Sequence, residues 1–171
     1  MPAFAKNSQS KKLLNLLWWI VFTAVALAVQ VNINMGIDLL VAGLIISLQE
    51  KRITQTIWLV AAWVIIQEGM SDLAFGSTIL WYVGTTTLFY MCNWLFESRS
   101  IMFLILLCIV LGAWHGLLTA MMVSMEDYAI VVNRLAWENL FQSCIILPVW
   151  FLAHKLRGAL SVGENNGRTI V

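Results

Sequence analysis

Six apolar stretches separated by short polar segments cover most of the chain. They lie at about 13–29, 34–48, 56–74, 78–96, 101–125 and 139–154. A helix needs about 20 apolar residues to cross a hydrocarbon core roughly 30 Å thick. The pattern therefore predicts an all-α integral membrane protein, built as a compact bundle of about six transmembrane helices. The second stretch is short for a crossing.

The basic residues predict the orientation of this bundle. Six crossings place nine of the ten lysines and arginines on one side of the membrane, and short loops rich in these residues stay in the cytoplasm. The nine are Lys6, Lys11, Lys12, Lys51, Arg52, Arg99, Lys155, Arg157 and Arg168, and only Arg134 falls on the other side. We expect a cytoplasmic N-terminal segment 1–12, a six-helix transmembrane domain 13–157 and a cytoplasmic tail 158–171, with both termini cytoplasmic.

Composition agrees with one membrane domain. Hydrophobic residues make up 61% of the chain and charged residues 11%, whereas about a quarter of the residues in a soluble domain are charged. The segment 49–55 mixes charges of both signs and is interpreted as a solvated loop.

Known catalytic and binding motifs are missing from the sequence. It contains no GxGxxG, no phosphate-binding loop, no HExxH and no GxSxG. Its two histidines are far apart, and its three cysteines lie in apolar stretches without CxxC spacing. We expect no catalytic residue, no metal site, no cofactor and no nucleic-acid partner.

Four ionisable residues are predicted to lie at a similar depth in the outer half of the bundle: Asp38, Glu68, Asp72 and His115. A charged side chain in lipid costs several kcal/mol, so such groups face the bundle interior or water. Two interpretations stay open. The four residues form a polar cavity or proton relay open to the outside, or they are structural. In the structural case Asp38 and Asp72 cap helix ends while Glu68 pairs with His115.

The fifth stretch contains Gly112 and Gly116 at the GxxxG spacing that allows helices to approach closely. Packing within the chain is the interpretation we favour over dimerisation.

The segment Glu68-Gly69-Met70-Ser71-Asp72-Leu73-Ala74-Phe75-Gly76-Ser77 resembles the rod-shape-determining protein MreD family of the bacterial inner membrane. That family carries Gly, then Asp-Leu, then Gly-Ser in this order, matched here by Gly69, Asp72, Gly76 and Ser77. The aromatic stretch 148–152, followed by Lys155 and Arg157, is similar to the family's last helix. The resemblance spans about residues 13–158. Thr78 to Leu80 stand where the family often has a further glycine.

This resemblance implies a non-enzymatic, multi-pass scaffold of the cell-elongation machinery in the bacterial inner membrane. Its implied partners are the bilayer, MreC and cell-wall synthesis proteins, and its implied role is to support peptidoglycan synthesis. Under this interpretation, the outer loop 126–138 is the expected polar contact with a partner, through Tyr128 and Arg134.

Two alternatives remain. The MreD family is similar in fold to the S-components of energy-coupling-factor transporters, which are also six-helix proteins of this size. Such a protein would bind a vitamin or metal in an outward cavity. The last alternative is an accessory subunit of another membrane complex.

Overall fold

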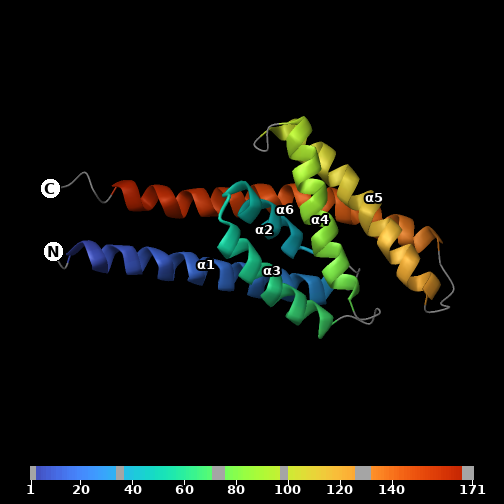
Figure 1. Ribbon diagram of the computed structural model, residues 1–171, viewed down its shortest axis with the longest axis horizontal. Helices are drawn as coiled ribbons and strands as arrows, with labels where there is room; N and C mark the ends of the chain where they lie inside the picture. The colour runs from blue at the N-terminus through green and yellow to red at the C-terminus, as the bar shows by residue number, and fades with distance from the viewer. Residues whose placement is uncertain (1–2, 34–36, 71–75, 97–99, 126–131, 167–171) are drawn as a thin grey trace.

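The computed structural model describes residues 3–33, 37–70, 76–96, 100–125 and 132–166, and their side chains except at 3–12, 132–135 and 159–166. All the regular secondary structure in this part of the chain is helical (Figure 1). Its helices are α1 (Ala3–Ile33), α2 (Leu40–Gln49), α3 (Ile53–Glu68), α4 (Ser77–Leu95), α5 (Ile101–Met125) and α6 (Val132–Asn166).

The helix bounds agree best with the sequence prediction in the middle of the chain. Helix α5 has the predicted bounds, and α4 differs by one residue at each end. Helices α1 and α6 are longer than predicted, since α1 begins at Ala3 and α6 extends from Val132 to Asn166. Most of the predicted N-terminal segment and much of the predicted tail are therefore helical.

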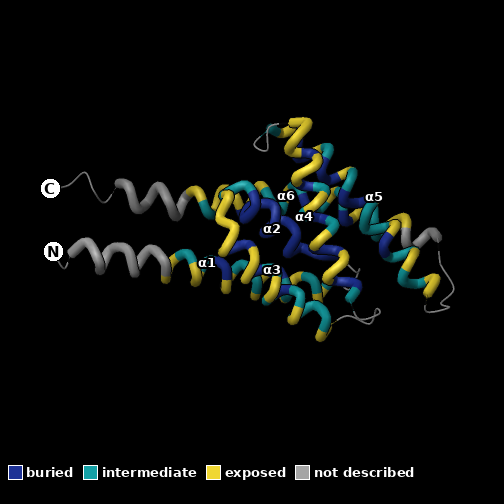
Figure 2. Tube along the Cα trace, in the orientation of Figure 1, coloured by how far each residue is buried: buried dark blue, intermediate teal, exposed yellow. Residues whose placement is uncertain are grey.

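Helix α2 lies at the centre of the molecule and is the dark blue helix in Figure 2. Residues 40–48 are all buried, and α2 contacts α1, α3, α4 and α6. Its 10 residues make a helix only about 15 Å long, half the thickness of a hydrocarbon core. The prediction of a helix from residue 34 is thus wrong at its start, because residues 37–39 are not helical.

Within the described residues, three helical segments are long and apolar enough to cross a membrane: Leu13–Ile33, Ile101–Met125 and Ala136–Gly158. Their outer faces carry large apolar side chains, such as Leu17, Val25 and Ile109, which are 57%, 57% and 61% exposed. Water would solvate these faces poorly, whereas lipid solvates them well. The length and surface of these helices are those of a membrane protein.

Glycines allow close packing between helices. A Cβ atom at Gly112 would lie 1.7 Å from Ser143 Oγ, and one at Gly116 would lie 2.3 Å from Asn139 Nδ2. Both neighbours are on α6, so the GxxxG pair packs α5 against α6, which confirms the predicted packing within the chain.

The start of α1 and the end of α6 lie at the same end of the molecule (Figure 1). Side chains from the two helices meet there, since Arg157 Nη2 donates a hydrogen bond of 2.8 Å to Asn15 Oδ1. An even number of membrane crossings would produce this arrangement.

Candidate functional site

Asp38 lies two residues before the start of α2, and its carboxylate accepts hydrogen bonds from three groups. Oδ1 accepts from the backbone N–H of Leu40 and from Gln67 Nε2, both at 2.9 Å. Oδ2 accepts from Trp81 Nε1 at 2.8 Å. The Leu40 bond satisfies an N–H at the start of α2, where the first turn of a helix has no partner of its own.

Two glutamines bond the non-helical backbone that leads into α2. Gln142 Oε1 accepts from the Asp38 N–H at 2.9 Å, while its Nε2 donates to the Asp38 carbonyl at 3.0 Å. Gln30 Nε2 donates to the Ile37 carbonyl at 2.8 Å. Irregular backbone at membrane depth is tolerated only where its polar groups are satisfied and protein covers it. Gln30, Gln67 and Gln142 were missed by the sequence analysis, although amides inside apolar stretches were the available signal.

A cavity of about 380 Å³ opens beside Asp38 and is called the outer cavity below. Side chains from α1, α3, α4 and α5 line it together with the segment before α2. Its polar lining residues are Gln30, Asp38, Gln67, Ser77, Thr78, Trp81, His115 and Thr119, and its apolar ones are Leu27, Val31, Ile37, Met70 and Leu118. Asp38 and His115, two of the four residues predicted to share a layer, therefore line one cavity.

His115 is fixed from two sides. Its Nδ1 lies 2.9 Å from Asn139 Oδ1 on α6, and its ring packs edge-on against Trp81 with 5.2 Å between ring centroids. The pairing of His115 with Glu68 considered from the sequence is not what the structure shows, because Asn139 takes that place.

Glu68 instead binds the backbone at the start of α4. Its carboxylate accepts from the N–H of Gly76, at 3.2 and 3.1 Å, and from the N–H of Thr78 at 3.1 Å. Gly76 has a φ of 96°, a left-handed conformation that glycine adopts without strain. A negative charge at the N-terminus of a helix is also favourable. Glu68 thus connects the end of α3 to the start of α4.

The structure describes only some of the other predicted site residues. Gly69 ends α3 and Ser77 is buried at the start of α4. Asp72 and Tyr128 lie outside the described residues, as does the side chain of Arg134. The backbone of Arg134 belongs to α6, so the predicted outer loop 126–138 is helical from Val132 onward.

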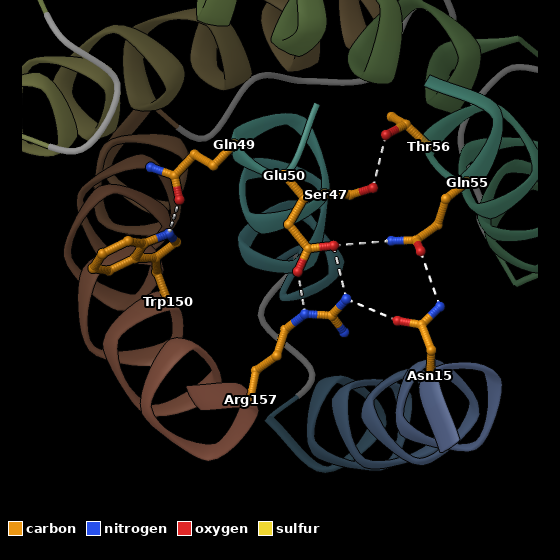
Figure 3. Close-up of polar contacts among 8 residues, drawn as sticks. All are labelled: Asn15, Ser47, Gln49, Glu50, Gln55, Thr56, Trp150 and Arg157. Carbon is orange, nitrogen blue, oxygen red and sulfur yellow. Dashed lines mark hydrogen bonds and ion pairs between the residues drawn. The ribbon is translucent and has the colours of Figure 1, made fainter. Parts of the chain in front are cut away.

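A second polar cluster lies at the other end of α2, where α1 and α6 meet, and is called the inner ring (Figure 3). Arg157 Nε forms an ion pair with Glu50 Oε1, and Arg157 Nη2 donates to Glu50 Oε2 at 2.7 Å. Gln55 Nε2 donates to the same Oε2 at 3.3 Å, and Asn15 Nδ2 donates to Gln55 Oε1 at 2.9 Å. With the bond from Arg157 to Asn15, four side chains close a ring.

The inner ring corrects the interpretation of residues 49–55 as a solvated loop. Gln55 is buried and Glu50 is partly buried, while Lys51, Arg52 and Thr54 are exposed. The guanidinium of Arg157 also lies over the rings of Trp18 and Trp19, at 4.6 and 4.9 Å. Such contacts add to the ion pair, so Arg157 connects α6 to α1 and to the α2–α3 turn.

Among the described residues, no three His, Cys, Asp or Glu side chains come together as ligands for a metal ion. The geometry defines a class: an all-helical chain with apolar helices of membrane-spanning length, a half-length buried helix and a polar cluster at each end of that helix. Comparison of the chain with protein-family models, curated proteins and solved structures found no match.

Proposed function

We propose that the chain is a non-enzymatic scaffold of the bacterial cell-elongation machinery in the inner membrane. In this proposal it crosses the membrane six times with both termini in the cytoplasm, and binds MreC-like and cell-wall synthesis proteins to support peptidoglycan synthesis. The observation that carries the proposal is the sequence of the segment 68–77, whose Gly-Asp-Leu-Gly-Ser order resembles the MreD family.

In the described part of this segment, two residues of the motif form the start of α4. Gly76 takes a conformation that disfavours other residues, and Ser77 starts α4 with its side chain buried. A motif that builds a helix start fits a protein whose task is to hold a shape. The carboxylates of Asp38 and Glu68 also accept hydrogen bonds from the protein itself, as expected for a scaffold.

The test is purification of the tagged chain in a gentle detergent, followed by mass spectrometry of the proteins that accompany it. The proposal expects MreC-like and cell-wall synthesis proteins to be enriched over a tagged membrane protein of similar size. Replacing Tyr128 and Arg134 with alanine is expected to reduce this recovery, whereas Arg52→Ala, at the other end of the bundle, serves as the matched control. No enrichment of cell-wall proteins from intact membranes would contradict the scaffold.

The outer cavity favours a second candidate, a small-solute binding protein similar to transporter S-components. A cavity of about 380 Å³ falls within the roughly 300–1,000 Å³ typical of small-molecule sites. This candidate expects a bound small molecule, or an ATPase pair with a coupling subunit, in the same purification.

A further inference from the structure

We propose that the outer cavity binds a small organic cation that carries an ammonium group on an apolar body. This inference goes beyond the scaffold function, and it names the ligand class on which the second candidate function depends. Three features of the cavity support this inference: the charge of Asp38, hydrogen-bond acceptors without a donor among the described residues, and the apolar and aromatic side chains that line it.

Asp38 gives the cavity a negative charge. Three neutral N–H donors of the described residues bond its carboxylate, namely a backbone amide, an amide side chain and an indole, and the hydroxyl of Tyr82 also interacts with it. Three N–H donors suit an ionised carboxylate, which only accepts hydrogen bonds. These neutral donors stabilise the negative charge of Asp38, but they add no positive charge to balance it.

No lysine or arginine with a described side chain lines the cavity. Lys51, Arg52, Lys155 and Arg157 belong to the α2–α3 turn and the far part of α6, at the other end of α2. A cationic ligand would therefore supply a countercharge that the described side chains around the cavity lack, and an anion would meet repulsion from Asp38.

Further groups of the cavity accept rather than donate. Gln30 Nε2 donates a hydrogen bond to the Ile37 carbonyl, whereas Gln30 Oε1 is buried without a partner among the described residues. A buried acceptor without a donor is costly, so a ligand N–H there would be favourable. His115 has its Nδ1 engaged by Asn139, and Nε2 is its remaining polar atom.

The walls fit the apolar part of such a molecule. Leu27, Val31, Ile37, Met70 and Leu118 supply aliphatic surface. The indole of Trp81 adds an aromatic ring, which attracts ammonium groups more strongly where water is excluded. A bare metal ion would use neither the apolar walls nor this ring.

The test uses three probes with similar apolar bodies: phenethylamine as its ammonium ion, 2-phenylethanol and 3-phenylpropionate. Binding to the purified full chain in lipid nanodiscs is measured by isothermal titration calorimetry at pH 7, with empty nanodiscs subtracted. We expect the ammonium probe to bind at least tenfold more tightly than either of the others. Equal binding of the three, or no binding of the ammonium probe to folded protein, would overturn the proposal.

Two variants locate the site. Asp38→Asn is expected to abolish the preference for the cation. Because Asp38 also holds the start of α2 and this variant could unfold, Thr119→Phe is the second variant, which fills the cavity from α5. Thr87→Phe is its matched control, since both threonines donate to the carbonyl four residues earlier and Thr87 lies outside the cavity. Thr119→Phe should remove binding and Thr87→Phe should retain it; the reverse would refute the assignment.

These outcomes are independent of the scaffold. Recovery of MreC-like proteins without cation binding would reject the cavity proposal alone, whereas cation binding without such partners would reject the scaffold alone.

Discussion

Two carboxylates bond the starts of helices in this protein. A helix that begins inside the bundle leaves N–H groups that water cannot reach. Asp38 accepts from the first turn of α2, and Glu68 accepts from the first turn of α4. The negative charge of each residue also favours the positive end of the helix dipole. Buried acidic residues in an apolar sequence can therefore mark interrupted helices as well as ligand sites.

The residues of the two polar clusters differ in how visible they are in the sequence. Asp38 and His115 stand out because a charge or imidazole in an apolar stretch is costly, and both line the outer cavity. Gln142 gives a weaker signal and bonds Asp38 across 104 positions of sequence. Pairing at such distance depends on how α2 and α6 pack, which no local pattern contains.

The contacts of the Arg157 side chain lead to a prediction about the stability of the protein. Its side chain is 17% exposed and that of its partner Glu50 is 25% exposed, so water screens the pair only in part. Arg157→Met would leave Glu50 without its cation and remove the contacts with Trp18 and Trp19. We expect a loss of about 1–3 kcal/mol in the free energy of unfolding, measured as a lower melting temperature of the detergent-purified protein.

The control for this prediction is Arg52→Gln, which removes a basic residue that is exposed on the neighbouring turn. Glu50→Gln combined with Arg157→Met should cost less than the sum of the two single changes, because neither charge is then left alone. Additive losses would mean that the pair is not coupled.

Among the helices, α2 shows most clearly what hydropathy misses. Its apolar run predicts a helix from residue 34, whereas the helix begins at Leu40 after a non-helical segment. Apolar composition indicates burial but not backbone conformation, and here Gln30, Gln142 and Asp38 allow the backbone to leave the helix. The longer ends of α1 and α6 were missed for the opposite reason, since helices can extend beyond the apolar region without any hydropathy signal.

The close contact between α5 and α6 leads to a second prediction about the stability of the protein. A Cβ at Gly112 would overlap Ser143 Oγ and lie 3.3 Å from the carbonyl of Asn139, so the helices would have to separate. We expect Gly112→Ala to destabilise the protein by roughly 1–3 kcal/mol, which thermal unfolding in detergent would detect. Gly158→Ala is the control, because an added Cβ there meets nothing within 4 Å.

A second change tests the cause. Ser143→Gly removes the side chain that the new methyl group would strike, so it should restore part of the stability lost in Gly112→Ala. If the double variant is no better than the single one, the close approach of α5 and α6 at this point is not what limits the substitution.

For the whole molecule, the two ends of α2 divide the structure into an outer and an inner polar region. The outer cavity lies beside the start of α2, and the inner ring closes around its end. The inner ring contains the residues at which α1 and α6 come together, close to the basic residues Lys51 and Arg52. In the proposed topology this region lies at the cytoplasmic boundary of the membrane, where polar groups and Trp rings are favoured.

The proposed topology gives the last prediction. If six crossings hold, Lys51→Cys in the α2–α3 turn and a cysteine added after Val171 face the cytoplasm. A membrane-impermeant maleimide should then label neither in intact cells and both in inverted membrane vesicles, after Cys92, Cys108 and Cys144 are replaced with serine or alanine. Arg134→Cys is the matched position for the opposite side and should be labelled in intact cells. Arg157 of α6 donates a hydrogen bond to Asn15 of α1, so the proposed topology places these two residues on the same side of the membrane. Labelling of Lys51→Cys from outside would place the inner ring at the outer surface and reverse the topology.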